Sequence, residues 1–215
     1  MIKNHFQEKF DAGEVLEFSP NNTAIILGSA SPRRSRLLES HGIEHFVVVS
    51  SVDDTILNDE FSHDNISSSS AAEYTARMAF EKLVPFIGKV KNAAVICADT
   101  TIWCDRRILE KPISCERCIE QHKFISGKTN INFTAYAMYY NGKILEKIFP
   151  TEVKVAPLSN DIIEKILQDE EILDCAGYKN QGSINSFLTF NKYETDNLTG
   201  LCVQTVKNML QEIKL

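Results

Sequence analysis

The sequence predicts an α/β fold with a mixed β-sheet. Three kinds of segment support this prediction: apolar runs typical of buried strands, capped amphipathic segments typical of helices, and one hairpin turn, Asn141-Gly142. They follow one another in mixed order, which favours an α/β architecture. The chain has 215 residues, enough for one substantial core or for two lobes that share a sheet. We expect residues 1–22 to be a polar extension and residues 23–215 to form the domain.

The first predicted elements lie in residues 23–38, TAIILGSASPRRSRLL. The apolar run from Ala24 to Leu27 is typical of a strand, and a serine-rich loop follows it. Ser31 is placed to cap a helix, and Pro32 suits the first helical turn because its missing N–H would have no helical partner there. His41-Gly42 predicts the end of this helix.

Strand and helix patterns continue to residue 127. We expect a strand over Glu44–Val52, a loop over 58–69, a helix from the Ser70-x-x-Glu73 capping box to about Lys82, and a buried strand over 93–98 that continues to Cys104. Ser114 predicts the cap of a helix over 115–124, which Ser126-Gly127 ends.

The last third of the chain begins with the predicted hairpin. Residues 130–155 place FTAYAMYY and KILEKI on either side of the Asn-Gly turn. Ser159 is placed to cap a helix, NDIIEKILQD, and a loop over 174–185 and a short strand over 186–190 follow. The chain closes on an amphipathic helix whose apolar side carries Leu201, Val206, Met209, Leu210 and Ile213.

Composition narrows the class of protein. The formal net charge of −6 argues against general affinity for nucleic acid or for an anionic membrane. No apolar stretch approaches the ~20 residues needed to span a bilayer. The first 22 residues have neither the apolar centre of a secretory signal nor the low acid content of a transit peptide, so we expect a cytoplasmic protein.

The six cysteines are scattered along the chain, and several lie in apolar runs, as free core thiols do. Cys115-x-x-Cys118 has the spacing of half a zinc site or of a redox pair. Because no second pair and no His-x-x-x-His lies at a suitable distance, we favour free thiols over a metal or redox site.

The predicted helix start at residues 28–36 has the features of an anion site. Free backbone N–H groups and the positive end of the helix dipole lie there, together with serines and the arginines Arg33, Arg34 and Arg36. This pattern suggests a phosphate site, although an ordinary capped helix with solvated arginines has the same spacing.

Acids and lysines form a second pattern. Asp53 and Asp54 follow one predicted strand and Asp99 follows another, an arrangement suited to a divalent cation. Lys82 and Lys111 are placed to add positive charge to the same cleft. Such parts suit phosphoryl chemistry, although a turn at the paired aspartates and solvated lysines would explain each residue singly.

The segment GSASPRRSRLL at residues 28–38 resembles the signature of the Maf family of nucleoside triphosphate pyrophosphatases. The resemblance continues in order from about residue 24 to 210. It includes 48–54, the helix from Tyr74 to Lys82, Ala98-Asp99-Thr100, ILEKP at 108–112, ISGK at 125–128, Thr151-Glu152-Val153, 176–182 and 197–201.

The resemblance implies an elongated mixed sheet with flanking helices and two lobes around a central cleft, a fold shared with the inosine-triphosphate pyrophosphatases. It also implies a homodimer that cleaves a nucleoside triphosphate between the α and β phosphates with Mg²⁺ or Mn²⁺. The resemblance implies that Asp99 is the proton acceptor, that Asp54 is a metal-binding or catalytic acid, and that both aspartates bind the metal. It implies phosphate contacts from Ser29, Arg33, Arg34, Lys82 and Lys111. It also implies that substrate choice depends on Thr100, Arg33 and Gln181. Thr100 favours dTTP and UTP.

The chain departs from the family pattern at several positions. Asp54 stands where Glu is usual, Ser51 where Asp is usual, Glu110 where Gly precedes the lysine, Asn130 where His is frequent, and Cys175 where Lys is frequent. The loop before Gln181 is one residue short. Glu110 is expected to add negative charge near the phosphates.

Three functions therefore stay open on the sequence. A dTTP/UTP pyrophosphatase is the first. The second is a nucleotide-binding regulator of septum formation with weak or lost catalysis, which the changes at 51, 54 and 110 favour. The third is a pyrophosphatase directed at 7-methyl-GTP, against which Thr100 argues.

Overall fold

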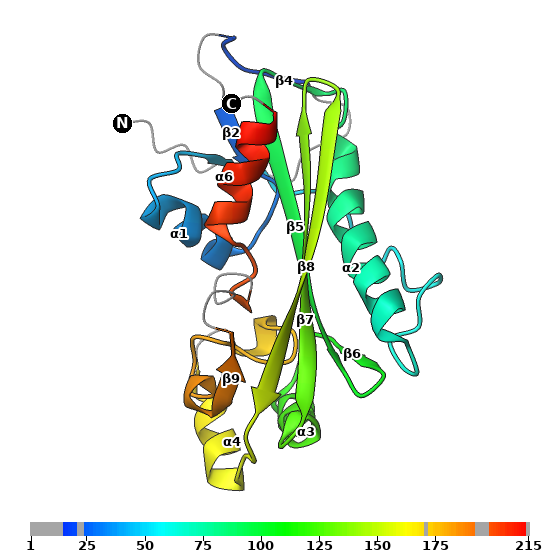
Figure 1. Ribbon diagram of the computed structural model, residues 1–215, viewed down its shortest axis with the longest axis vertical. Helices are drawn as coiled ribbons and strands as arrows, with labels where there is room; N and C mark the ends of the chain where they lie inside the picture. Colours follow the sequence, from blue (N-terminus) through cyan, green and yellow to red (C-terminus); the bar gives the residue numbers. More distant parts are fainter. Residues whose placement is uncertain (1–14, 21–23, 170–171, 192–197, 214–215) are drawn as a thin grey trace.

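The computed structural model describes residues 15–20, 24–169, 172–191 and 198–213, and it confirms the predicted α/β fold. Within these ranges a mixed sheet of seven strands has the order β3-β2-β5-β7-β8-β9, with β6 paired to β5 (Figure 1). Strands β2, β3 and β5 pair in parallel, and the remaining neighbours are antiparallel. Three long strands, β5, β7 and β8, connect the upper and lower parts of an elongated molecule.

The strands are β1 (Leu16–Glu17), β2 (Ala24–Leu27), β3 (Phe46–Val47), β4 (Val90–Lys91), β5 (Ala93–Cys104), β6 (Arg107–Leu109), β7 (Thr129–Tyr140), β8 (Lys143–Val155) and β9 (Leu188–Phe190). The predicted hairpin is confirmed: Asn141 and Gly142 join β7 to β8 with φ values of 45° and 88°. Part of the predicted extension forms β1, which pairs in parallel with β4, while residues 1–14 and 21–22 lie outside the described residues.

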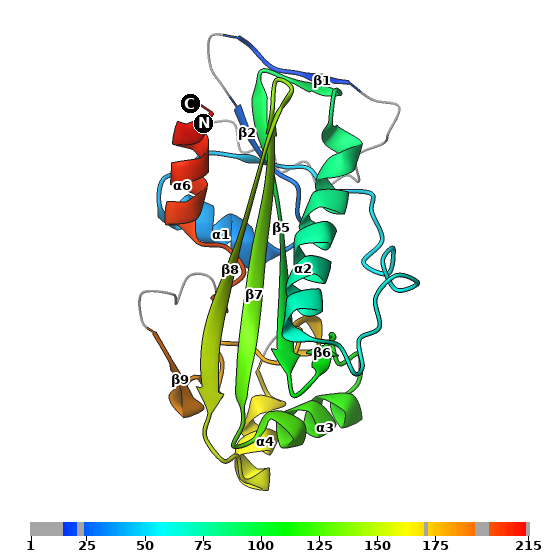
Figure 2. The ribbon, with the colours of Figure 1, turned by 45° about the vertical axis from the view of Figure 1, so that its right-hand side comes forward.

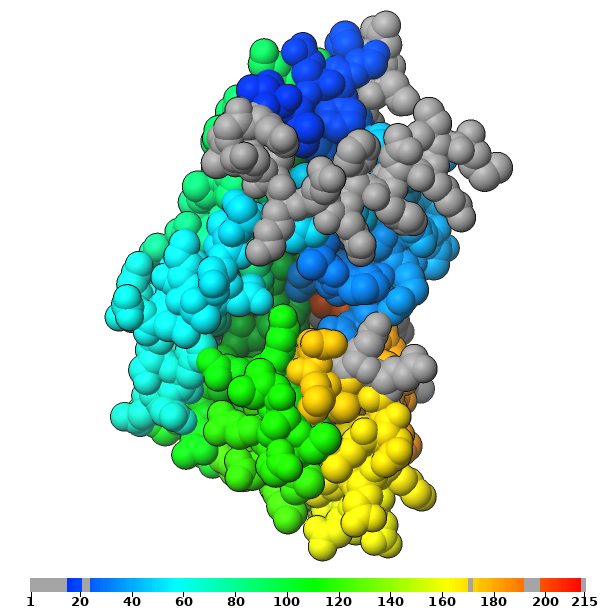
Figure 3. Space-filling model, turned by 180° about the vertical axis from the view of Figure 1, so that it is seen from behind, coloured from blue at the N-terminus to red at the C-terminus, as the bar shows by residue number. Residues whose placement is uncertain are grey.

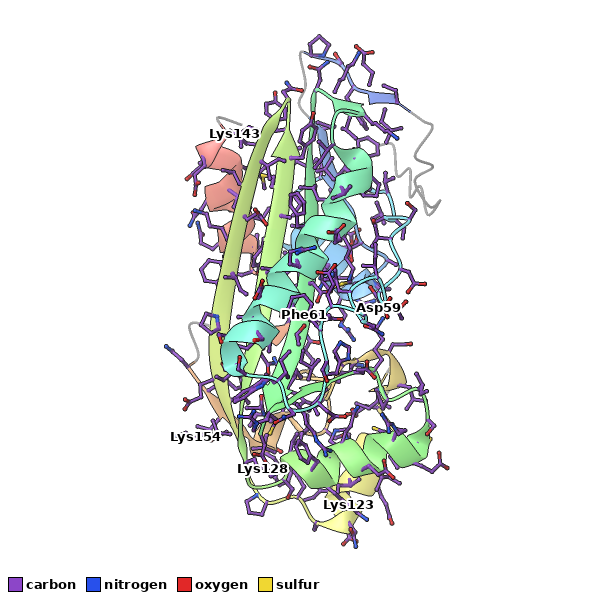
Figure 4. The ribbon with its side chains drawn as sticks, turned by 90° about the vertical axis from the view of Figure 1, so that its right-hand side faces the viewer. Asp59, Phe61, Lys123, Lys128, Lys143 and Lys154 are labelled. Carbon is purple, nitrogen blue, oxygen red and sulfur yellow. The ribbon has the colours of Figure 1, made fainter. Side chains whose placement is uncertain are left out.

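The helices are α1 (Pro32–Ser40), α2 (Ser68–Leu83), α3 (Cys115–Ile125), α4 (Asn160–Ile166) and α6 (Val203–Glu212), with short 3₁₀ turns at Val84–Phe86, Ile172–Asp174 and Asn185–Phe187. Helix α2 covers one face of the upper sheet, and α1 and α6 cover the other (Figure 2). Helices α3 and α4 lie at the lower end, where Figure 4 labels Lys123 on α3 and Lys128 beyond its end.

Because successive side chains of β5 point to opposite faces of the sheet, this strand packs into two hydrophobic cores. Ile96 and its neighbours two residues away pack toward α1 and α6, whereas Val95 and Cys97 pack toward α2. All of them are fully or almost fully buried. Below this region, Ile102 and Cys104 join a third cluster with residues of α3 and α4. The strand is therefore apolar on both faces until it reaches Asp99 and Thr100.

Three predicted boundaries were wrong. The predicted strand over Glu44–Val52 shrinks to β3, because its short partner β2 ends at Leu27. Helix α2 begins at Ser68, and its N-cap is Ser67, whose hydroxyl accepts from the Ser70 N–H at 3.1 Å. Helix α4 ends at Ile166, three residues before the predicted end.

Other predicted helix ends are confirmed in position. Ser114 and Ser159 cap α3 and α4 through their side chains. Ser31 occupies the N-cap of α1 without a capping hydrogen bond from its side chain, and His41 is the C-cap. Gly42 follows with φ of 70°, the left-handed conformation that ends many helices.

The six cysteines are free thiols, as expected. Cys115 is exposed and Cys118 is buried, so the two residues of the Cys-x-x-Cys spacing lie in different surroundings. Within the described ranges no cluster of three or more His, Cys, Asp or Glu side chains is arranged for a metal ion. Among the same residues, no helix is both long enough and apolar enough to cross a membrane.

Candidate active site

One cleft of about 680 Å³ lies where the strands of the sheet pass between the upper and lower parts. Figure 3 shows this face hollowed between the segment around α1 and the segment near residues 175–180. The loop after β2, α1, the end of α2, the middle of β5 and the loop 174–181 all contribute to its wall. Every predicted site residue lines it: Ser29, Arg33, Arg34, Asp54, Lys82, Asp99, Thr100, Lys111 and Gln181.

The loop that opens the cleft begins at Gly28, directly after β2. Because Gly28 has no side chain, its backbone packs closely against β5. Its N–H still pairs with the Ile96 carbonyl at 2.8 Å, so the chain leaves the sheet one residue later. A side chain on Gly28 would collide with the Cys97 sulfur. Ser29, directly after it, is buried and accepts hydrogen bonds from the Ser31 N–H and from Arg34.

Lys82 is the centre of the charged group. Its Nζ lies 2.6 Å from Asp99 Oδ1 and 2.8 Å from Asp54 Oδ1, so one ammonium group bridges two carboxylates. Lys82 comes from the last turn of α2 and Asp99 from the middle of β5, whereas Asp54 comes from the loop after β3. Lys111 Nζ approaches the second oxygen of Asp54 at 3.4 Å.

Burial and charge act in opposite directions on these groups. Burial is the largest single influence on Lys82 and would lower its pKa, but Asp99 and Asp54 together outweigh it and raise that pKa. For Asp54, burial would raise the pKa, and the charges and hydrogen bonds of Lys82 and Lys111 lower it overall. The lysine therefore stays protonated and Asp54 stays ionised near neutral pH.

The neighbouring aspartates have different roles: Asp53 forms a turn, and Asp54 lines the cleft. Asp53 Oδ1 accepts from the N–H and the hydroxyl of Thr55, both at 2.8 Å, which is an Asx-type turn. This turn lets the next side chain, Asp54, reach Lys82. The loop runs beside α2, where Figure 4 labels Asp59 and Phe61, and the Phe61 ring packs edge-on against Tyr74 at 5.7 Å.

Arg34 joins three segments that line the cleft. Its Nε donates to the Gly200 carbonyl at 2.8 Å, Nη1 donates to Ser29 Oγ at 3.1 Å, and Nη2 lies 3.5 Å from Thr100 Oγ1. Burial is the main cause of its lowered pKa, and the charge of Asp99 opposes that effect. Among the described residues, three of its five N–H groups have protein partners, which leaves two that could bind a phosphate oxygen.

Arg33 and Cys175 form a second pair on the cleft wall. Arg33 Nη1 donates to Cys175 Sγ at 2.7 Å, which connects α1 to the loop 174–181. The thiol is buried within the cleft wall. The lysine that the resemblance leads us to expect at this position would place a second cation beside Arg33, whereas the thiol acts as an acceptor.

The Glu110 carboxylate pairs with His63 and does not line the cleft, contrary to the expectation from the sequence. Its Oε1 lies 2.5 Å from His63 Nδ1, and its backbone carbonyl accepts from the Gln121 side chain. The His63 partner draws the carboxylate toward the loop over 51–67, and Glu110 is not among the residues that line the cleft. The expected negative charge near the phosphates is therefore held in an ion pair with His63 when that ring is protonated.

Sequence reasoning missed several residues of the cleft. Asn132 on β7 and Tyr178 in the loop 174–181 line its lower part, as do the apolar side chains of Ile102 and Leu198. Three alternate positions of β7, Asn130, Asn132 and Thr134, are buried and polar, and they interrupt an inward face that is more apolar from Tyr136 to Met138. That interruption of the pattern was the available signal.

The chain is similar to several known proteins. The chain is 31% identical to a dTTP/UTP pyrophosphatase of Neisseria gonorrhoeae over 88% of this chain and 93% of that protein. It is 29% identical to a dTTP/UTP pyrophosphatase of Pyrococcus abyssi over 87% and 95%. A solved HAM1 protein from Coxiella burnetii aligns with 92% of this chain and 100% of its own at 13% identity and a TM-score of 0.46.

The family described as Maf-like protein matches residues 24–213, a range that begins with β2 and extends past the end of α6. This range contains every charged residue of the cleft described above. The chain belongs to the family of Maf-like proteins.

Proposed function

We propose that this protein hydrolyses nucleoside triphosphates between the α and β phosphates, with dTTP and UTP as its preferred substrates. The observation that carries the proposal is the convergence of Asp54, Lys82 and Asp99 within hydrogen-bond distance in a cleft that also holds Arg34 and Lys111. Relatives about 30% identical over most of both chains are named dTTP/UTP pyrophosphatases.

The proposed chemistry moves one proton and breaks one phosphoanhydride bond. Asp99 takes a proton from a water molecule as the water oxygen bonds to the α-phosphorus. The bond from that phosphorus to the bridging oxygen then breaks, and pyrophosphate leaves with the electron pair. Arg34, Lys111 and Lys82 stabilise the negative charge on the phosphate oxygens.

We call this charged part of the cleft the phosphate end: Ser29, Arg34, Asp54, Lys82, Asp99 and Lys111.

A divalent cation fits the two carboxylates. Asp54 and Asp99 both point at Lys82 Nζ, so their hard oxygen donors converge on a small region. Mg²⁺ is commonly held by one or two carboxylates together with substrate phosphates, which agrees with the absence of a larger acidic cluster among the described residues. Bound Mg²⁺ or Mn²⁺ would neutralise phosphate charge, and Asp54 and Asp99 would hold it.

The test is a nucleotide panel with product identification. Purified protein is incubated with Mg²⁺ or Mn²⁺ and each triphosphate in water enriched in ¹⁸O. We expect pyrophosphate and monophosphate from dTTP and UTP, with the heavy oxygen in the monophosphate because water attacks the α-phosphorus. Inorganic phosphate and diphosphate as products, or no pyrophosphate from any triphosphate by folded protein, would overturn the proposal.

The two alternatives have less support. The regulator of septum formation rested partly on Glu110, which pairs with His63 instead of facing the phosphate end. The 7-methyl-GTP alternative has no support from the relatives described above, which are dTTP/UTP pyrophosphatases. The homodimer and the cytoplasmic location stay predictions from the sequence.

A further inference from the structure

A buried polar cluster lies in the lower part of the cleft, away from the phosphate end. Asn130 and Asn132 point from β7 to the same side of the sheet, and their exposed fractions are 0% and 2%. The Tyr178 hydroxyl lies 3.0 Å from Asn130 Oδ1 and 3.2 Å from Asn132 Oδ1. Burial raises the pKa of Tyr178, so the hydroxyl keeps its proton at neutral pH.

One hydroxyl proton cannot serve both asparagine oxygens. In this amide orientation the Asn130 nitrogen is also buried, with no hydrogen-bond partner among the residues that the structure describes. Turning the Asn130 amide by half a turn removes both conflicts, since its NH₂ group then donates to the Tyr178 oxygen. An under-satisfied buried oxygen is more common than an unpaired buried N–H, so this orientation is favoured.

The hydrogen bonds then run in one direction, from Asn130 to Tyr178 to Asn132. The Tyr178 proton goes to Asn132 Oδ1, which fixes the orientation of that amide. Its NH₂ group has no hydrogen-bond partner among the described residues, and the Asn132 side chain lines the cleft. The protein therefore presents a donor, and not an acceptor, to a ligand at this point.

The position of Asn132 matches the base of a bound nucleotide. Asn132 pairs with Ile102, three residues beyond Asp99 on β5. Because side chains alternate along a strand, Asp99 and Ile102 point to opposite faces, and the cleft that both residues line extends to both faces. Three residues span about 10 Å along the strand, comparable to the span from a phosphate group across a ribose to a pyrimidine ring. Ile102 and Leu198 give the cleft apolar walls here, which suit the faces of a planar base.

We propose that the Asn132 amide donates a hydrogen bond to the carbonyl at C4 of uracil or thymine, and that Tyr178 is the positioning residue that fixes this choice. The C4 substituent lies opposite the ring nitrogen that carries the sugar, so it reaches furthest from the phosphates. Cytosine has an amino group there, a donor that would face the donor of Asn132. This inference rests on the proposed function, and Ile102, Asn132, Tyr178 and Leu198 form what we call the base end.

The decisive variant is Asn132→Asp, which has nearly the same shape. It keeps an oxygen for the Tyr178 proton and replaces the donor that faces the cleft with an acceptor. We expect kcat/KM for UTP to fall about 10-fold and the preference for UTP over CTP to reverse, the size of effect that one hydrogen bond gives. The matched control is Asn208→Asp on the outer side of α6, which makes the same chemical change outside the cleft.

Tyr178→Phe tests the positioning role separately. It removes the proton that fixes the amide, so Asn132 can turn its oxygen or its nitrogen to the base. We expect the UTP:CTP ratio of kcat/KM to move toward one, with kcat for UTP changed less than KM. An unchanged ratio in both variants, with folded protein, would overturn the inference, and so would a wild-type enzyme that does not distinguish UTP from CTP.

A binding measurement separates this inference from the proposed function. Calorimetry with the non-hydrolysable α,β-imido analogues of UTP and CTP needs no turnover. If wild-type protein releases no pyrophosphate but binds the UTP analogue more tightly, and Asn132→Asp reverses that order, the proposed function fails and the inference stands. If turnover occurs and the order of binding is the same in both proteins, the inference fails alone.

Discussion

The two ends of the cleft hold their polar side chains in different ways. At the phosphate end the charges are paired before any ligand arrives: Lys82 bridges two carboxylates, and Arg34 has three protein partners. At the base end, Asn132 presents an amide group whose hydrogen-bond partner within the described part of the chain is the Tyr178 hydroxyl. Prior pairing fixes the positions of charges, which is what stabilisation of a transition state requires.

The ends also differ in how they follow the family pattern. At the phosphate end, Arg34, Lys82, Asp99 and Lys111 match the family pattern and only Asp54 departs from it. The departures at Asn130 and Cys175 lie beside the base end and beside Arg33. Substitutions at the phosphate end should therefore change the rate of reaction for every triphosphate. Substitutions at the base end or at Arg33 and Cys175 should change which triphosphate binds, and by less.

Asp99→Asn is expected to have the largest effect. The amide keeps the shape of the carboxylate but cannot accept the proton of water, so kcat should fall by about 10³-fold, the scale of general-base catalysis. The fall should be equal for dTTP and UTP. Calorimetry with a non-hydrolysable analogue should show binding within a few-fold of wild type. Near-normal turnover in this variant would remove Asp99 from the role of base.

Lys82→Met should reduce both activity and stability. It leaves the carboxylates of Asp54 and Asp99 without their shared cation, and since Lys82 and Asp99 are each only 16% exposed, the loss should be about 1–3 kcal/mol of unfolding free energy. Denaturant titration measures this loss, and the rate should fall for all triphosphates alike. A stable variant with altered base preference would contradict the assignment of Lys82 to the phosphate end.

The loss of unfolding free energy in Lys82→Met should depend on pH in one direction. The folded protein raises the pKa of Lys82 above its ordinary value of 10.5, so its contribution is complete below that pH and is lost as the pH rises through the folded value. The difference in unfolding free energy between wild type and Lys82→Met should therefore stay constant from neutral pH to about pH 10 and shrink above it. A difference that grows with alkaline pH would show that the bridge is not its source.

The fold was predictable where local signals and tertiary contacts agree. The Asn-Gly turn and the long apolar strand β5 were predicted because each sequence pattern is typical of only one kind of structure. The start of α2 was not, since the run of serines at 67–70 offers several caps and packing around Ile66 selects Ser67. The length of β3 was missed because it depends on its partner strand, β2.

The same distinction explains the candidate site. Acids at strand ends and cations beside a helix start could be predicted singly, and the structure places them in one cleft. The base end could not be predicted from the sequence. The orientation of the Asn132 amide depends on the hydroxyl proton of Tyr178, which lies 46 residues away in sequence. Likewise the pairing of Glu110 with His63 joins residues 47 positions apart.

Cys175→Ala should have the smallest effect, and it tests whether the contact with Arg33 serves substrate binding or the reaction. Removing the thiol takes away the acceptor that holds Arg33 Nη1 at 2.7 Å. The guanidinium is then less well ordered before the substrate binds, at a cost of about 0.5–1.5 kcal/mol, so KM should rise about 2- to 10-fold while kcat stays the same.

The matched control for this last variant is Cys115→Ala, which removes an exposed thiol of α3 outside the cleft and should leave both constants unchanged. A fall in kcat comparable to that of Asp99→Asn would mean that Arg33 acts on the reacting phosphates, and the division between the two ends would then have to be redrawn. A rise in KM that is larger for UTP than for CTP would instead show that Arg33 assists the selection of the base. An equal rise for both nucleotides would assign Arg33 to the parts of the substrate that they share.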